Sequence, residues 1–427
     1  MFGVARLHFN EKQTYDEVVL GDVIELQSGF AFSSTLFSEH GQKLVTPKNF
    51  TKSGNALFTP QNTKFTTERV NENYVCRPGD LLLLLTDLTQ SCELLGKPLG
   101  LREIDGEVLL NQRIVKVTPD SRRLVKNFLK QYFLTEKYHK RIVQTASGTT
   151  VRHSSNKILT SLELSLPNLE EQTKIAEFLD EVDKKIRLLE ARHEQLTLYK
   201  KAMMQKIFSQ EIRFKQEARS AEGATGKQKS EDGGEFPDWE TKKFGEVFEE
   251  IKDQVGDRDI ETYSISAGVG FRSQKEKFGK NISGNQNRKY IVVRPGQFSY
   301  NKGNSKSYKY GCVYLNKLGF PIAVPNVFIS FKLIHEKMHP EFFAQLFVDH
   351  YLDWGLRRII SSSARMDGLL NVPKKEFFKL KVPVPHPEEQ QKIADFLSVI
   401  DEKTDAVSAQ ITQMQSFKKG LLQQMFV

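Results

Sequence analysis

The sequence has 427 residues, 39% of them hydrophobic, which is enough for two or three domains with cores of their own. No apolar run approaches the roughly 18 residues that a membrane-spanning helix needs, and residues 1–17 show no signal-peptide pattern. We therefore expect a cytoplasmic protein with reduced cysteines and no membrane partner. The formal net charge is +9, and it is concentrated in residues 1–169, which carry +4, and residues 237–386, which carry +8. Two basic stretches favour a polyanionic partner, most often nucleic acid.

Residues 1–166 are predicted to form a first domain of mixed α and β structure. The segments 108–110 and 113–117 have the short length and β-branched content of strands, and residues 127–134 have helical spacing.

Residues 167–210 are predicted to form one long helix. Pro167 ends the preceding strand, and acidic residues follow where the first turn of a helix favours them. Apolar residues then recur at alternating spacings of four and three as far as Ile207, which is typical of a coiled coil, and Lys200 interrupts the stripe. The predicted packing residues of this helix are Ile175, Leu179, Val182, Ile186, Leu189 and Leu196.

Residues 211–236 are predicted to be a flexible linker, because the stretch from 220 to 235 is rich in Gly, Ser, Ala and charge. Residues 237–385 are predicted to form a second domain. Its strands are expected at 311–315 and 327–333, followed by a Phe-rich helix at 340–348.

Residues 386–427 repeat the first long helix. Residues 167–208 and 385–426 align without a gap at an offset of 218, with 17 identities in 42 positions, and Lys418 interrupts the stripe where Lys200 does. A helix of this length, roughly 58 Å, cannot bury its stripe alone. We expect the two helices to pack antiparallel, as twofold-related halves do; the alternative is that each helix covers only its own domain. The predicted packing residues of the second helix are Ile393, Leu397, Ile400, Val407, Ile411 and Met414.

A strand that ends in proline, then Glu-Glu-Gln-x-Lys-Ile-Ala-x-Phe-Leu and a long heptad helix, used twice in one chain, resembles the specificity subunit of type I restriction enzymes. The resemblance covers the whole chain, and the helices are its specific part. It implies an α+β fold, with two tandem α/β target-recognition domains separated by two long antiparallel coiled-coil helices.

The same resemblance implies the function. Each domain would read one half of a bipartite, asymmetric site in double-stranded DNA, while the helices set the spacing and dock two methylase subunits. Motor-nuclease subunits would join the full complex. The chain itself would be non-catalytic, directing DNA methylation, of adenine in this family, and restriction. It would bind no cofactor or metal, because S-adenosylmethionine, ATP and Mg²⁺ are expected on the partner subunits.

Candidate DNA contacts are basic, amide and hydroxyl side chains in loops, because Lys and Arg bind phosphate and guanine while amides can bond adenine. For each of them, an ordinary solvated loop is the alternative interpretation. In the first domain they are Lys48, Asn49, Lys140, Arg141, Thr149 and Arg152. In the second domain they are Asn301, Lys302, Asn304, Lys306, Arg357, Arg358 and Arg365.

Two other functions stay open. Pro237-Asp238 followed by Glu250-Ile251-Lys252 matches the PD…ExK pattern of metal-dependent nucleases, although short patterns arise by chance in a chain with 27% charged residues. A coiled-coil scaffold that binds only proteins is the other alternative. The chain has no Pro-Pro pair for an adenine-methylase motif and no GxxxxGK[ST] phosphate loop, which argues against a methylase or an ATP-driven motor.

Overall fold

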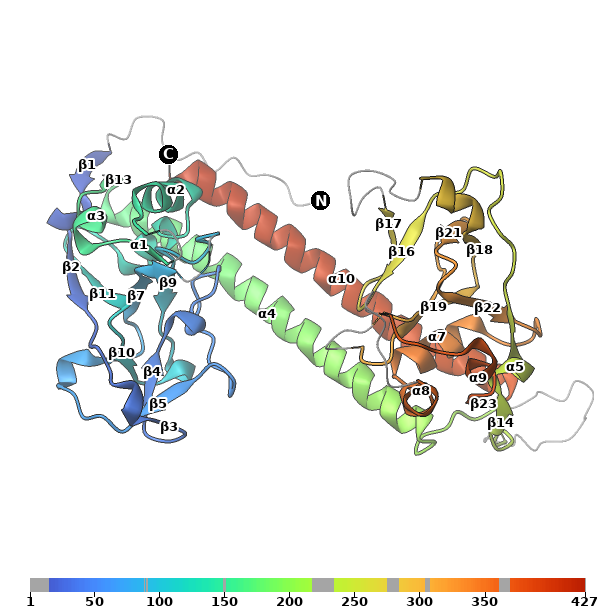
Figure 1. Cartoon of the computed structure of the whole chain (residues 1–427). Helices are drawn as coiled ribbons and strands as arrows, with labels where there is room; N and C mark the ends of the chain where they lie inside the picture. Colours follow the sequence, from blue (N-terminus) through green and yellow to red (C-terminus); the bar gives the residue numbers. More distant parts are fainter. Residues whose placement is uncertain are drawn as a thin grey trace, which may run out of the picture. The chain divides into compact units, whose positions relative to one another are not determined.

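The computed structural model describes residues 15–426, except 88, 90, 149–150, 217–233, 275–283, 304–307 and 361–368. The chain divides into two compact units (Figure 1), here called unit 1 (Met1–Ala191 with Ser408–Val427) and unit 2 (Arg192–Val407). Among the described helices, none combines the length and the apolarity that crossing a bilayer would require.

Unit 1 contains short strands followed by short helices. Its sheets have the strand orders β3-β5-β4-β10-β6, β2-β11-β7-β9, β1-β13 and β12-β8. The elements are β1 (Asp16–Val19), β2 (Ile24–Ser28), β3 (Phe37–Ser38), β4 (Gln42–Val45), β5 (Lys64–Thr66), β6 (Val75–Cys76), β7 (Leu81–Leu84), β8 (Thr86–Asp87), β9 (Pro98–Gly100), β10 (Val108–Leu110), β11 (Ile114–Pro119), α1 (Lys126–Tyr132), α2 (Glu136–Thr145), β12 (Arg152–His153), α3 (Asn156–Thr160) and β13 (Glu163–Leu166).

The all-leucine strand β7 explains how unit 1 is layered. Successive side chains of a strand point to opposite faces of the sheet. Leu81 and Leu83 lie in the core that contains residues of α1 and α2, whereas Leu82 and Leu84 lie in a second core with Val108 of β10. Strand β7 is therefore buried on both faces, which is why it is a continuous apolar run and not an alternating one.

Unit 2 likewise combines a four-stranded sheet and smaller sheets with short helices. Its sheets have the orders β15-β22-β19-β20, β14-β23, β16-β17 and β18-β21. The elements are β14 (Glu240–Lys243), α5 (Phe244–Val247), β15 (Phe248–Glu250), β16 (Tyr263–Ser266), β17 (Gly270–Ser273), β18 (Ile291–Val293), β19 (Phe298–Asn301), β20 (Cys312–Leu315), β21 (Ile322–Val324), β22 (Ile329–Leu333), α7 (Pro340–Val348), α8 (Asp353–Ile359), α9 (Lys374–Phe377) and β23 (Lys381–Val384).

Phenylalanine rings fill the core of unit 2. Phe298 and Phe331 on neighbouring strands stack with their ring centroids 5.3 Å apart, and Phe248 meets Phe331 edge-on at 5.1 Å and Phe343 of α7 at 5.0 Å. Stacked and edge-to-face pairs of this kind add to the stabilisation that comes from burying the rings. The Phe-rich helix expected from the sequence is thus α7, which closes this core.

Two long helices, α4 (Leu169–Phe208) and α10 (Pro387–Met425), are shared by the two units. In unit 1, Leu179 and Val182 from the first half of α4 pack with Leu421 and Leu422 from the end of α10. In unit 2, the end of α4 packs with the beginning of α10. This pairing of one helix's start with the other's end confirms the antiparallel prediction. Both clusters also contain domain residues, so each helix covers its own domain as well.

The predicted packing residues of the two helices differ in burial. Nine are buried: Ile175, Leu179, Val182, Ile186, Leu189, Ile393, Leu397, Ile400 and Val407. Leu196, Ile411 and Met414 are half-buried. Near the end of α4 the buried side chains are Met204 and Ile207, and Met203 is only half-buried.

Candidate nucleic-acid interface

In unit 2, two of the segments predicted from sequence lie side by side. Gly303, just after β19, forms an isolated bridge with Leu369, and the Leu370 amide donates to the Lys302 carbonyl at 2.9 Å. Tyr308, at the other end of the same loop, lies over His350 beside α8, with ring centroids 5.1 Å apart. The loop after β19 and the region of α8 therefore form one surface.

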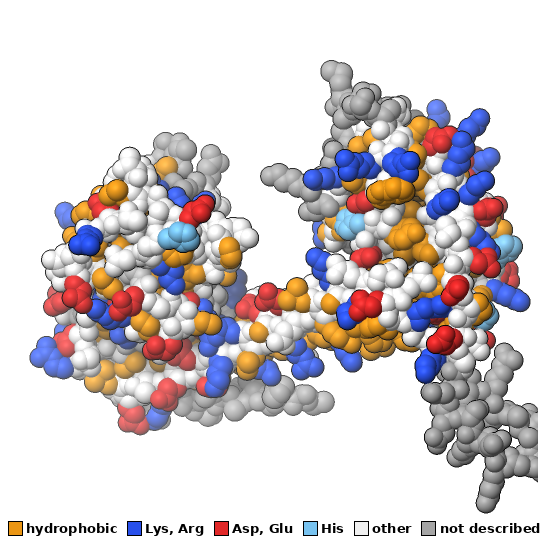
Figure 2. Space-filling view, turned by 90° about the horizontal axis from the view of Figure 1, so that it is seen from below, with side chains coloured by type: hydrophobic (Ala, Val, Ile, Leu, Met, Phe, Trp, Pro, Cys, Tyr) orange, Lys and Arg blue, Asp and Glu red, His pale blue; other side chains and the backbone are white. Residues whose placement is uncertain are grey.

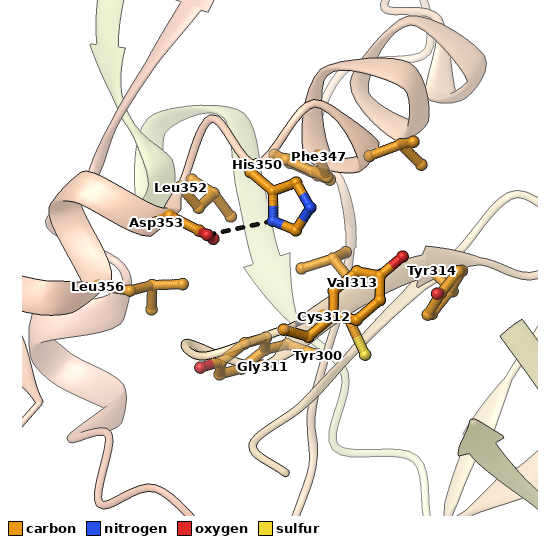
Figure 3. Close-up of a pocket in the computed structure, with 12 residues that line it drawn as sticks. Tyr300, Gly311, Cys312, Val313, Tyr314, Phe347, His350, Leu352, Asp353 and Leu356 are labelled. Carbon is orange, nitrogen blue, oxygen red and sulfur yellow. Dashed lines mark hydrogen bonds and ion pairs between the residues drawn. The ribbon is translucent and has the colours of Figure 1, made fainter. Parts of the chain in front are cut away.

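A small pocket lies beneath this surface, and Figure 3 shows His350 and Asp353 facing Cys312 and Tyr314 across it. His350 has a left-handed backbone (φ 61°), and its Nδ1 lies 3.1 Å from Asp353 Oδ2. The pocket has a volume of about 20 Å³, enough for one water molecule and too small for a nucleobase. Burial raises the pKa of the Cys312 thiol to about 11, so it is protonated and a poor nucleophile at neutral pH.

The outer face of α8 carries exposed basic and aromatic side chains. Arg357 and Arg358 are exposed, and neither forms an ion pair with any residue of the described segments. Trp354 is 72% exposed, and the Arg358 guanidinium lies 4.7 Å from its ring centroid. An unpaired guanidinium held over an indole can contact a phosphate or a base edge while the ring offers a stacking face.

Two residues predicted to touch DNA in unit 2 hold the loop together instead. The Asn301 side chain donates to the Ile265 carbonyl at 3.2 Å and accepts from the Gly303 amide at 2.9 Å. Lys302 Nζ donates to the Val372 carbonyl at 3.4 Å. Both side chains are half-buried, and their hydrogen bonds stabilise the loop in place of the predicted base contacts.

In unit 1, α2 carries exposed basic residues, as α8 does in unit 2. Lys140 and Arg141 are exposed in the middle of the helix. Arg152 is half-buried in β12, and its Nη2 donates to the Val143 carbonyl of α2 at 3.1 Å. Strand β12 pairs with β8, where Thr86 Oγ1 lies 3.0 Å from His153 Nδ1. Arg152 thus ties α2 to this pair of strands.

Lys48 and Asn49 are neighbours in sequence but not in environment. Lys48 is exposed, whereas Asn49 is fully buried. Asn49 Oδ1 accepts from the Thr46 amide at 2.7 Å, and its Nδ2 donates to the Leu57 carbonyl at 3.2 Å. The prediction that Asn49 contacts DNA is corrected on this ground, because both ends of its amide serve a buried turn. The predicted contacts Thr149, Asn304, Lys306 and Arg365 lie outside the described residues.

The two basic pairs are equivalent in the repeated fold, a relationship that the sequence interpretation missed. Helices α1 and α2 in unit 1 correspond to α7 and α8 in unit 2, and the β8–β12 pair corresponds to the Gly303–Leu369 bridge. The Lys140–Arg141 pair and the Arg357–Arg358 pair therefore fall on matching helices, 217 residues apart. That offset, close to the 218 of the long helices, was the signal available in the sequence. In Figure 2, Lys and Arg side chains are spread over the visible surfaces of both units.

The carboxylates of the PD…ExK string are held in separate ion pairs. Glu250 pairs with Lys374, and the fully exposed Asp238 lies 3.5 Å from Arg213. Across the parts of the chain that the structure describes, no three His, Cys, Asp or Glu side chains are gathered in a way that could hold a metal ion. The geometry therefore does not favour a nuclease site at this string.

Comparison with known proteins gives consistent matches. The family model for the type I restriction modification DNA specificity domain matches residues 12–198 and again 237–414. The MjaVIII specificity subunit of a type I restriction enzyme from Methanocaldococcus jannaschii is 27% identical over 209 residues, 48% of this chain and 47% of that protein. The putative MjaX specificity subunit from the same organism is 25% identical over 323 residues, 74% of this chain and 70% of that protein.

The aligned part of this chain thus spans about half the length of the first of these relatives. Among solved structures, the type I restriction-modification system S subunit from M. genitalium superposes with a TM-score of 0.59 and 16% identity, covering 98% of each chain. At that identity, the likeness shows a common fold.

Proposed function

Because this chain belongs to the family of type I restriction–modification DNA specificity subunits, we propose that each of its two units reads one half of a split site in double-stranded DNA. The observation that carries the proposal is the repeated position of two exposed basic pairs, Lys140–Arg141 on α2 and Arg357–Arg358 on α8. Two copies of one fold that present positive charge at the same place suit a polymer of phosphates.

The two surfaces differ in detail, which supports an asymmetric target. Unit 2 adds the exposed Trp354 beside Arg358, whereas the offset of 217 places Lys137 at the equivalent position of α2 in unit 1. Phosphate contacts position a protein on DNA, and differing base contacts specify the sequence. We propose that the half site read by unit 1 differs from that read by unit 2, so that the composite site is not a palindrome.

We further propose that α4 and α10 set the distance between the half sites and dock two methylase subunits. In this proposal the chain is a non-catalytic, cytoplasmic guide for DNA methylation, of adenine by analogy with the family, and for restriction when motor-nuclease subunits join. S-adenosylmethionine, ATP and Mg²⁺ would belong to those partners.

The deciding experiment is sequencing of base modification in cells that carry the methylase with or without this chain. We expect a split, asymmetric methylated motif that disappears when the chain is absent. An active methylase whose methylation pattern is the same in both strains would overturn the proposal.

A second experiment separates DNA reading from a purely protein-binding scaffold. The assembled complex is expected to bind its target with an affinity that falls steeply as salt rises, because phosphate neutralisation releases counterions. Binding to the target that does not respond to salt would refute phosphate contact and favour the scaffold.

A further inference from the structure

The two lysines that interrupt the apolar stripes form ion pairs between the long helices, one of them buried and the other partly buried. In unit 1, Lys418 Nζ of α10 lies 2.6 and 2.8 Å from the carboxylate oxygens of Asp183 in α4. Lys418 is 8% exposed and Asp183 4%. In unit 2, Lys200 Nζ of α4 lies 2.6 Å from Asp401 Oδ1 of α10, and these side chains are 17% and 38% exposed. The repeat offset of 218 relates Asp183 to Asp401 and Lys200 to Lys418, so the same pair forms twice.

A glutamine from each domain completes both pairs. Gln131 Nε2 of α1 donates to Asp183 Oδ2 at 2.9 Å, and Gln345 Nε2 of α7 donates to Asp401 Oδ2 at 2.8 Å. We call Gln131, Asp183 and Lys418 the unit 1 triad, and Gln345, Asp401 and Lys200 the unit 2 triad. Each triad joins a domain helix to both long helices.

The triads look costly when they are judged as stabilising elements. Burial lowers the pKa of Lys418 against the opposing effect of Asp183, which reflects the penalty of taking the ammonium out of water. The Oε1 atoms of Gln131 and Gln345 are both buried, and neither has a hydrogen-bond partner in the part of the chain that the structure describes. Apolar side chains of similar volume often stabilise such positions equally well or better. A role other than stability is therefore worth seeking.

Buried polar pairs distinguish one helix register from another. Leucine and isoleucine stripes can pair in several registers, because one apolar contact substitutes for another. Sliding one helix by a single turn, about 5.4 Å, would separate each lysine from its aspartate and leave the buried charges of unit 1 and the partly buried charges of unit 2 uncompensated. The apolar stripe supplies adhesion, while the triads penalise every register except one.

We propose that the two triads are positioning elements that fix the register of α4 against α10 and thereby the spacer between the two half sites of the DNA target. This proposal rests on the proposed function. A slip of one helical turn corresponds to between one and two base-pair steps, at about 3.4 Å per step. The triads would thus confine the complex to a single spacer length.

The test replaces both ion pairs with apolar residues in the full chain, as Asp183→Leu, Lys418→Met, Asp401→Leu and Lys200→Met, and sequences the DNA modified by its methylase complex. We expect a folded protein whose thermal unfolding midpoint is unchanged or higher, with methylation at more than one spacer length. A folded variant that keeps the single original spacer would overturn the proposal. The matched control is Glu170→Leu with Lys174→Met, an exposed pair on α4 that should leave the spacer unchanged.

A charge reversal decides the matter if the apolar variant does not fold. Lys418→Asp alone places two carboxylates together and is expected to abolish or scatter methylation. Adding Asp183→Lys restores an ion pair, and the Gln131 amide can turn to present its oxygen to the new ammonium. Recovery of the original spacer supports the proposal, and failure to recover it counts against it. If the wild-type chain directs no split motif at all, the proposed function itself fails, an outcome distinct from an unchanged spacer in the variants.

Discussion

Glu389 gives the sharpest prediction, because the repeat supplies its own control. Glu389 is fully buried at the start of α10, where Oε1 accepts from Arg213 Nε at 3.1 Å. Its Oε2 accepts from Arg213 Nη2 at 2.8 Å and from Trp239 Nε1 at 3.0 Å. The equivalent residue in unit 1 is Glu171, which is 7% exposed and has no hydrogen-bond partner among the described residues on either carboxylate oxygen.

The two glutamates should therefore respond oppositely to the same change. Glu389→Gln removes a charge that holds a bidentate guanidinium and an indole, and breaking a buried pair of this kind costs about 3–5 kcal/mol. The Arg213 side chain is 23% exposed, so water can partly solvate the guanidinium after the substitution. We therefore expect Glu389→Gln to lower the free energy of unfolding by about 3 kcal/mol. Glu171→Gln replaces an unpaired buried carboxylate with a neutral amide, which is expected to leave stability unchanged or raise it by about 1 kcal/mol.

Urea unfolding of the full chain can resolve these effects. Both tryptophans, Trp239 and Trp354, belong to unit 2, so their fluorescence follows that unit. Hydrogen exchange of residues 169–186 reports on unit 1. Glu389→Gln should lower the fluorescence midpoint, whereas Glu171→Gln should leave it unaltered and not weaken protection in unit 1. The reasoning is refuted if both substitutions destabilise their units equally, or if Glu389→Gln leaves the midpoint in place.

Replacing Arg357 and Arg358 together with alanine should reduce the slope of log affinity against log salt by up to about 1.8, roughly 0.9 for each phosphate contact, and should affect only one half of the motif; an unchanged slope would exclude both from the DNA backbone. Lys140→Ala with Arg141→Ala should do the same for the other half, and a change in both halves would contradict separate reading. Burial lowers the pKa of Lys97 from 10.5 to about 8, so the unfolded chain binds more protons between these values and the stability of unit 1 should rise as pH increases through that window. Lys97→Met should be more stable than the wild type at pH 7, and its stability should not rise with pH. Thermal unfolding between pH 7 and about 10.5 measures both effects. A variant whose stability rises with pH as the wild type's does would show that Lys97 is not the group responsible.

The long helices could be predicted from sequence because their pattern is local and repeated. Heptad spacing and a gapless internal match depend only on residues a few positions apart and on one offset, and α4 and α10 follow directly. Basic pairs such as Arg357–Arg358 could also be found, because charge next to an apolar helix face is expected to be exposed.

Other features depend on contacts that no local pattern encodes. Asn49 and Asn301 looked like base readers, yet an amide in a loop serves equally well to bond its own backbone, and only the fold decides between these roles. The predicted linker from residue 211 was inferred from composition, but Arg213 within it binds Glu389, 176 residues away. The pairing of Lys418 with Asp183 is likewise a long-range fact that heptad spacing records only as an interruption.

The sharing of α10 between the units has a consequence for synthesis on the ribosome. The core of unit 1 is completed by Leu421, Leu422 and the ring of Phe426, which lies 4.8 Å from Phe128. These residues are made some 230 positions after Ala191, a delay of roughly 10–45 s at 5–20 residues per second. Throughout that interval the part of the unit 1 core that α10 later covers is exposed to solvent. We expect a chaperone to bind this apolar surface during synthesis. Unit 2 faces no such wait, because Met204 and Ile207 emerge before the rest of its core.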